Sequence, residues 1–165
     1  MGSNPTGCTK NMKIYTLKFR QKINRNINDV FIFFSNPENL AHITPSKLNF
    51  KILTPLPIKM KEGQLIDYTI TILGKKIRWR TIISEYESPK YFIDQQLKGP
   101  YSMWHHKHEF EDRGEYVEII DTVNYVVPFG IIGRLVNYLF IHNDLDKIFK
   151  YRKKVIEKYF RKEVK

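Results

Sequence analysis

The chain of 165 residues is 42% hydrophobic and 14% aromatic, which indicates one folded domain with many rings inside it and excludes a largely disordered protein. Cys8 is the only cysteine, so neither an intrachain disulfide nor a cysteine-based zinc cluster can form. The net charge of +11 is spread along the chain, without a helix-turn-helix, zinc-finger or RNA-binding motif, so we expect no nucleic-acid partner.

The N-terminal sequence has no basic segment followed by a long apolar one, and the apolar run 125–141 is interrupted by Pro128, Arg134 and Asn137. These features, with the single cysteine, predict a soluble, cytoplasmic protein. Periodic sequence begins only at Met12. We therefore expect residues 1–11 to be a disordered tail or an expression scar, and residues 12–165 to form a single domain.

The first predicted element is a strand at 13–24, where apolar and polar residues alternate. Asn28 then fits the N-cap of a short helix. The apolar helical pattern that follows is interrupted at Asn36, and Pro37 fits the first turn of a second short helix that should end near Thr44.

From about Phe50 the apolar period changes to two, which indicates strands separated by turns that contain Gly or Pro. The spacing favours antiparallel hairpins. The predicted strands are 49–54, 64–73, 76–86, 91–98, 102–111 and 116–127.

After residues 128–130 the period returns to 3.6 and predicts one long closing helix. An antiparallel sheet with an apolar inner face must be covered, and this helix is the only large element left to cover it. We therefore predict an α+β fold in which a curved antiparallel sheet of about seven strands wraps around a long C-terminal helix and leaves a cavity. The expected inward stripe of the helix is Leu135, Leu139, His142, Leu145, Ile148, Phe149, Arg152, Val155, Ile156 and Tyr159.

The strand YSMWHHKHEF, residues 101–110, contains three histidines. Alternate residues of a strand share a face, so His105 should point outward beside Lys107 and Glu109. The inward set is then Ser102, Trp104, His106, His108 and Phe110.

A two-residue turn at Arg113-Gly114 would pair His106 with Asp121 across the next hairpin. Asp121 interrupts an otherwise apolar strand face, and a buried carboxylate requires a partner. We therefore predict contact between His106 and Asp121, which favours the protonated imidazole while burial opposes it.

The preceding strand allows two registers. A two-residue turn at 99–100 would direct Tyr91, Ile93, Gln95 and Leu97 inward. A three-residue turn would instead direct Phe92, Asp94 and Gln96 inward, with Asp94 opposite His106.

The hairpin around Gly74-Lys75 fits a type II′ turn that pairs Leu73 with Lys76. Arg78 and Arg80 then point to solvent. The inward face of this hairpin should carry Tyr68, Ile70, Ile72, Ile77, Trp79, Thr81 and Ile83.

Two histidines at i and i+2 beside a carboxylate can bind a metal, but the sequence places no further ligand with them, so we predict no metal and no cofactor. A catalytic dyad would need a nucleophile motif, which is also missing. We favour a polar anchor inside an apolar pocket. The predicted ligand-binding residues are Tyr68, Trp79, Asp94, Gln96, Trp104, His106, His108, Phe110, Asp121, Tyr125 and Leu139.

Several stretches resemble the SRPBCC superfamily, also called START-like or helix-grip proteins, and most closely a bacterial subgroup similar to polyketide cyclases/dehydrases. They are FFSNPENLAHITP, ILTPLPIKMKEGQLIDYTI, RWRTII, QLKGPYSMWHHKHEF, DTVNYVVPFGIIG and IFKYR. The resemblance extends from Met12 to Arg152. It implies a deep cavity between the sheet and the C-terminal helix that binds apolar or aromatic molecules, lipids, sterols or polyketides. Some relatives are enzymes, and many only bind or carry ligands.

We therefore expect a protein, monomeric or homodimeric, that binds a hydrophobic or aromatic small molecule with a His/Asp polar anchor. The first alternative is a cyclase, dehydratase or hydrolase in which His106 and Asp121 form an acid-base pair. The second is lipid binding or transfer at membranes, which requires exposed apolar residues beside basic ones at the cavity mouth.

Overall fold

The computed structural model describes residues 12–72 and 74–162. Seven antiparallel strands form one sheet in the order β1-β7-β6-β5-β4-β3-β2. The expectation for residues 1–11 and the predicted pairing of Leu73 lie outside the described residues. The strands are β1 (Tyr15–Ile23), β2 (Lys51–Ile52), β3 (Leu65–Ile72), β4 (Lys75–Glu87), β5 (Tyr91–Lys98), β6 (Met103–Asp112) and β7 (Val117–Val126).

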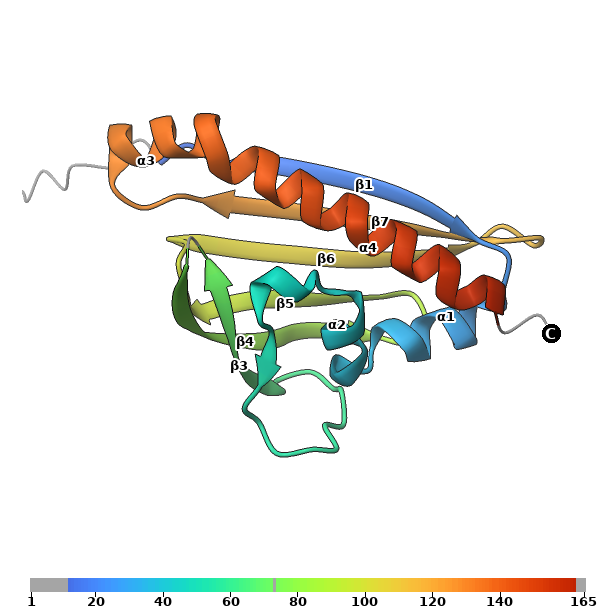
Figure 1. The fold of residues 1–165 in the computed structure, drawn as a ribbon. Helices are drawn as coiled ribbons and strands as arrows, with labels where there is room; N and C mark the ends of the chain where they lie inside the picture. Colours follow the sequence, from blue (N-terminus) through green and yellow to red (C-terminus); the bar gives the residue numbers. More distant parts are fainter. Residues whose placement is uncertain (1–11, 73, 163–165) are drawn as a thin grey trace, which may run out of the picture.

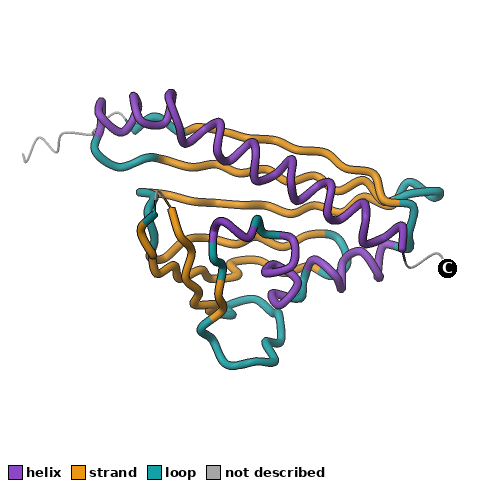
Figure 2. The backbone as a smooth tube through the Cα atoms, viewed as in Figure 1, coloured by secondary structure: helices purple, strands orange, loops and turns teal. Residues whose placement is uncertain are grey.

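The helices lie on one face of this sheet, and the long C-terminal helix runs along the strands (Figures 1 and 2). The curved sheet and the closing helix confirm the predicted α+β arrangement. The helical elements are α1 (Ile27–Phe34), α2 (Pro37–Ile43), the short 3-10 turn η1 (Ser46–Leu48), α3 (Gly130–Val136), the π-helical turn η2 (Asn137–Ile141) and α4 (His142–Lys162).

Local sequence explains the two short helices. Pro37 opens α2 as predicted, and the Asn36 side chain accepts a hydrogen bond from the Glu38 N–H. The prediction of Asn28 as the cap of α1 is wrong, because the side chain of Asn26 accepts from the Asn28 N–H.

The predicted strand 49–54 shrinks to the two residues of β2. Asn49 has a left-handed backbone with φ of 43°, which is incompatible with a strand. The N–H groups of Leu53 and Thr54 both donate to the Asp67 carbonyl, at 2.8 and 3.2 Å, so the regular ladder ends there.

Two predicted registers are shifted by two residues. Asp121 pairs with His108, not with His106, because the loop between β6 and β7 has four residues instead of two. In this loop the Asp112 carboxylate accepts from the Gly114 N–H, which widens the turn. Likewise Ile72 pairs with Lys75 in the β3–β4 hairpin. A shift of two preserves the face of every side chain, so the predicted inward sets are retained.

The closing helix changes phase at η2. Leu145, Phe149 and Ile156 are buried as predicted, whereas Leu135 and Leu139 are exposed, contrary to the prediction. A π-helical turn inserts an extra residue, so the apolar stripe of α4 does not continue onto α3. At the other end Phe160 is buried in place of the predicted Tyr159.

Two apolar cores hold the helix against the sheet. The Phe31 core joins α1, the adjoining end of the sheet and the last turns of α4; its buried members include Val30, Phe31, Phe33, Phe92, Phe110, Ile119, Ile156 and Phe160. The Tyr125 core joins the start of α4 to the opposite end of the sheet; its buried members are Leu17, Trp79, Trp104, Val123, Tyr125, Val127, Leu145 and Phe149.

Candidate functional site

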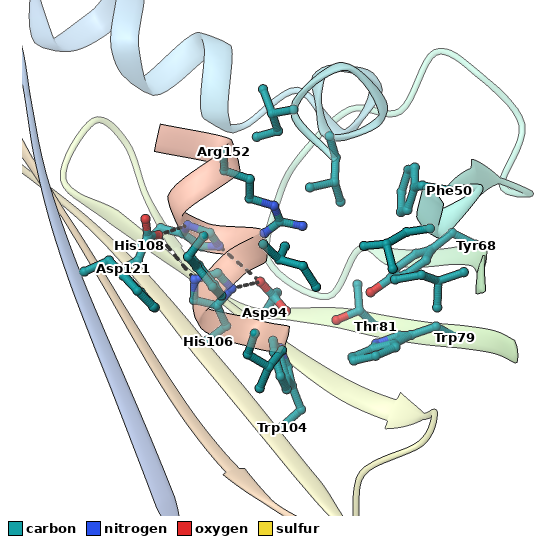
Figure 3. A pocket seen from close by; sticks show the side chains of 18 of the residues that line it. Phe50, Tyr68, Trp79, Thr81, Asp94, Trp104, His106, His108, Asp121 and Arg152 are labelled. Carbon is teal, nitrogen blue, oxygen red and sulfur yellow. Dashed lines mark hydrogen bonds and ion pairs between the residues drawn. The ribbon is translucent and has the colours of Figure 1, made fainter. Parts of the chain in front are cut away.

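A cavity of about 850 Å³ lies between the sheet and the C-terminal helix. Strands β3 to β7, the α1–α2 segment and α4 all contribute side chains to its wall. Much of the wall is aromatic or aliphatic, and Figure 3 shows a cluster of charged side chains within it. This combination of apolar walls with a few polar groups is typical of small-molecule sites.

The polar cluster is a closed ring of two imidazoles and two carboxylates, which we call the His/Asp ring. Its members are Asp94 from β5, His106 and His108 from β6, and Asp121 from β7. The two imidazole centroids lie 3.8 Å apart. Because the three strands are neighbours and all four side chains point inward, sheet register alone brings these groups together.

Each imidazole lies between the two carboxylates. On one side, Asp94 Oδ2 is 3.3 Å from His106 Nδ1 and 3.1 Å from His108 Nε2. On the other side, Asp121 Oδ1 is 3.2 Å from His106 Nε2 and 2.7 Å from His108 Nδ1. The last contact is an ion pair without hydrogen-bond alignment.

The ring keeps Asp94, Asp121 and His108 charged despite burial. Burial would raise the pKa of the Asp94 and Asp121 carboxyl groups, but hydrogen bonds and attraction from the two imidazoles lower the pKa of both. Burial would lower the pKa of His108, but Asp121 and Asp94 raise it to about 9. His108 is therefore protonated near neutral pH, and both carboxylates are ionised.

Arg152 reaches from α4 into the cavity (Figure 3). Burial lowers the pKa of its guanidinium, while Asp121, Tyr68 and Asp94 oppose that effect. One guanidinium nitrogen contacts Thr44 Oγ1 at 3.5 Å, and the buried Nε has no hydrogen-bond partner. A buried cation with a spare donor is a suitable group to receive an anionic or carbonyl oxygen.

Two further donors face the same space. The buried Trp79 Nε1 has no hydrogen-bond partner, and Tyr68 stacks beside Trp79 with centroids 5.7 Å apart. Burial, followed by the charge of Asp94, raises the pKa of Tyr68 well above its usual value, so its hydroxyl stays protonated. The groups with unused hydrogen-bonding capacity are therefore donors, and a bound molecule should supply acceptors.

The structure places the predicted site residues in two groups. The cavity wall includes Tyr68, Trp79, Asp94, Trp104, His106, His108 and Asp121. The others lie elsewhere. Phe110 is in the Phe31 core, the Tyr125 hydroxyl donates to Asn137 at 2.9 Å, Gln96 bonds the backbone of Tyr101, and Leu139 is exposed on η2.

The pairing of β5 with β6 settles the alternative left open by the sequence, because Asp94 lies opposite His106. Sequence reasoning assigned Arg152 to the helix stripe and not to the site. A lone cation on the apolar face of an amphipathic helix was the available signal. Phe50 and Phe149, which also line the cavity, had no signal that distinguished them from core residues.

A curved antiparallel sheet packed around a long C-terminal helix is the helix-grip fold, the fold that the sequence resemblance implied. Comparison with solved structures supports this fold. The protein TTHA0849 from Thermus thermophilus superposes with a TM-score of 0.73 at 14% identity, covering 92% of this chain and 100% of that chain. The Zhui aromatase/cyclase from Streptomyces sp. R1128 gives 0.73 at 10% identity, covering 93% and 97%.

Ginseng major latex-like protein 151 from Panax ginseng gives a TM-score of 0.64 at 13% identity, covering 89% of this chain and 97% of that chain. At these identities the shared property is the fold. Searches with protein-family models and against curated proteins find no match to the sequence. Within residues 12–72 and 74–162, no helix is both long and apolar enough to cross a membrane.

Proposed function

We propose that the protein binds a hydrophobic or aromatic small molecule in the cavity and holds its polar end through hydrogen-bond donors beside the His/Asp ring. The observation that carries this proposal is the combination of a cavity of about 850 Å³ with unpartnered buried donors at Arg152 and Trp79. Apolar walls supply affinity, and donors that would otherwise remain unsatisfied select a ligand with an acceptor such as a carboxylate or carbonyl.

The ring geometry supports binding over the acid-base alternative. His106 is only 3% exposed, and both of its nitrogens face carboxylates. A general acid or base must come within hydrogen-bonding reach of a substrate proton. Because both nitrogens of His106 face carboxylates, neither is directed at an organic molecule in the cavity, and the ring is suited to shape and charge the cavity wall.

Native mass spectrometry of freshly purified protein tests this proposal, since a deep apolar cavity is expected to retain a molecule. The matched variants are Ile70→Trp, which fills the cavity from β3, and Ile82→Trp, which adds the same ring on the outer face of β4. We expect Ile70→Trp to lose the bound mass and Ile82→Trp to keep it. Equal retention by both variants would place the ligand elsewhere and refute the proposal.

One observation favours lipid binding at a membrane as a second candidate. Segments 12–15, 74–77, 97–103 and 126–143 meet at one end of the molecule, the left end in Figure 1, and contain no Asp or Glu. We call this region the apolar end. It exposes the large side chains Met12, Ile14, Leu97, Phe129, Ile131, Ile132, Leu135, Tyr138, Leu139 and Phe140.

The apolar end also contains basic residues and reaches the cavity. Lys13, Lys75, Lys76, Lys98 and Arg134 lie in its segments. The cavity wall extends to this end at 72, 74, 140 and 141. Exposed apolar residues with several cations beside them suit the surface of an anionic bilayer, where each basic residue contributes about 1 kcal/mol. A ligand could then exchange between membrane and cavity.

Vesicle co-sedimentation with phosphatidylglycerol-containing liposomes tests this candidate. Ile132 on α3 and Ile32 on α1 are 71% and 66% exposed and lie at opposite ends of the molecule, so Ile132→Asp and Ile32→Asp are a matched pair. We expect binding by the wild type at low salt, weaker binding at high salt, and loss in Ile132→Asp only. Binding that is equal in both variants would exclude docking through the apolar end.

A further inference from the structure

The two sides of the His/Asp ring are not equivalent. His106 Nδ1 and His108 Nε2 converge on Asp94, while the opposite nitrogens of both rings face Asp121. Asp94 thus completes a set of two imidazoles and one carboxylate, and its three ligand atoms all lie within 4.8 Å of one another. The sequence alone could not place this third ligand, because the register of β5 was open.

We propose that Asp94, His106 and His108 form a binding site for a divalent first-row transition metal, Zn²⁺ or Fe²⁺. This inference uses the cavity of the proposed function but does not depend on the identity of any organic ligand. Nitrogen and carboxylate donors in this number suit such metals, whereas Ca²⁺ and Mg²⁺ prefer sites built from oxygen.

The spacing of the donor atoms fits this assignment. Metal bonds of about 2.1 Å at tetrahedral angles separate neighbouring ligand atoms by about 3.4 Å. Asp94 Oδ2 already lies 3.3 Å from His106 Nδ1 and 3.1 Å from His108 Nε2. The two imidazole nitrogens lie within 4.8 Å of each other, so the rings would turn toward each other on binding. The metal would replace the proton that His108 Nε2 directs at Asp94, and that proton would be released to solvent.

Asp121 lies where a supporting carboxylate is needed. Histidine ligands commonly donate their second N–H to a carboxylate, which fixes the ring orientation and strengthens the metal bond. Asp121 is 3.2 Å from His106 Nε2, in a hydrogen bond, and 2.7 Å from His108 Nδ1, where the ring must turn slightly before it can donate to the same carboxylate. With Asp94 on one side of the imidazoles and Asp121 on the other, two carboxylates lie close enough to balance the charge of a dication in this buried site.

A molecule bound to the metal would also lie beside Arg152 and Tyr68 of the cavity wall. Tyr68 and Arg152 line the same space as Asp94 (Figure 3). A metal held by three protein atoms keeps an open coordination position. An oxygen donor, such as a carboxylate or enolate, could bind the metal while the Arg152 guanidinium donates to it. This predicts chelating oxygen ligands as the preferred class.

The test is titration of untagged, chelator-treated protein with Co²⁺ and Zn²⁺ in the absence of organic ligand, in a Cys8→Ser background that removes the only thiol. We expect one Co²⁺ per chain, with a visible absorption band that Zn²⁺ displaces. Asp94→Asn and His108→Gln should weaken binding at least 100-fold. Asp121→Asn should weaken it 10- to 100-fold, as for other supporting carboxylates.

His105→Gln is the matched control, because His105 is on the same strand and points to the opposite face of the sheet. It should bind Co²⁺ like the wild type. Circular dichroism will check that each variant is folded. The wild-type stoichiometry is measured without any substitution at the site, so it tests the proposal even if one variant does not fold. Absence of saturable one-to-one binding in the wild type, or equal loss in His105→Gln, overturns the proposal. The retained mass of the native spectrum is a separate measurement, so either proposal can fail alone.

Discussion

At the scale of residues, the site depends on how buried charges are compensated. Asp94, Asp121 and His108 compensate one another within the ring, whereas Arg152 enters the cavity from the opposite layer and keeps an unpartnered Nε. Leaving a donor unpaired in a buried site costs stability, and a ligand acceptor recovers that cost on binding. Arg152 is therefore the residue whose contribution to binding and to stability should have opposite signs.

Replacing Arg152 with Met tests this opposition. The thermal midpoint should be unchanged or higher, because Met fills a similar volume without a buried charge. Affinity for the aromatic anion 2-naphthoate should fall by about 10- to 100-fold, the range for losing one hydrogen bond to a charged group. Isothermal titration calorimetry gives both affinities, with uncharged naphthalene as the reference ligand.

Naphthalene should bind Arg152→Met as well as it binds the wild type, since it has no acceptor. Lys154→Met is the control variant, because Lys154 is exposed on the same helix and does not line the cavity. A parallel loss of affinity for both ligands would mean that Arg152 supports the cavity shape and does not recognise charge.

At the scale of elements, the closing helix is one rod with an irregular turn. The π-helical turn η2 separates the exposed α3 from α4, which packs on the sheet. Asn137, at the start of η2, is 2% exposed and accepts a hydrogen bond from the Tyr125 hydroxyl of β7. This buried contact ties the turn to the sheet beside the apolar end, so it fixes where the exposed α3 begins.

The Tyr125→Phe substitution removes this tie without changing the ring that packs in the core. Because the Asn137 side chain is then left unsatisfied in a buried position, we expect a loss of about 1–3 kcal/mol in the free energy of unfolding, measured by urea denaturation. Tyr15→Phe is the control, since Tyr15 stacks on Tyr125 at 5.5 Å but is only half-buried. Equal small losses in the two variants would show that the Asn137 contact does not stabilise η2.

At the scale of the whole molecule, the order of elements was predictable because period-two and period-3.6 patterns alternate clearly along the chain. The registers between neighbouring strands were harder to predict than the order of the elements. The β6–β7 and β3–β4 hairpins were each misplaced by two residues. The β6–β7 loop is longer than predicted and contains a contact between Asp112 and Gly114, whereas the β3–β4 turn keeps two residues but begins one residue earlier. The faces were still right, because an even shift leaves each side chain on its side of the sheet.

The candidate site was predictable in part for the same reason. Alternation placed His106, His108 and Asp121 on one face, but the inward position of Asp94 depended on how β5 pairs with β6. The role of Arg152 in the site could not be predicted from the sequence, because only the packing of α4 over the sheet brings its guanidinium to the cavity. The exposure of Leu135 and Leu139 could not be predicted either, since no local pattern marks the π-helical turn.

The two cores give the final prediction. The Phe31 core and the Tyr125 core pack opposite ends of α4, and the cavity residue Arg152 lies on the helix between Phe149 of one core and Ile156 of the other. A ligand in the cavity would supply apolar contacts there. At 100 times its dissociation constant, 2-naphthoate should therefore raise the free energy of unfolding by about 2.7 kcal/mol and slow amide exchange in β3, β4 and α4 together.

Hydrogen exchange with mass spectrometry reads these elements separately. Ile70→Trp fills the cavity and should show neither stabilisation nor added protection, whereas Ile82→Trp should behave like the wild type. Protection confined to α3 would instead indicate that the probe binds the exposed apolar end. Residues of α4 belong to both cores. Protection from amide exchange along the whole of α4 would therefore mean that the ligand fills the cavity between the sheet and the helix.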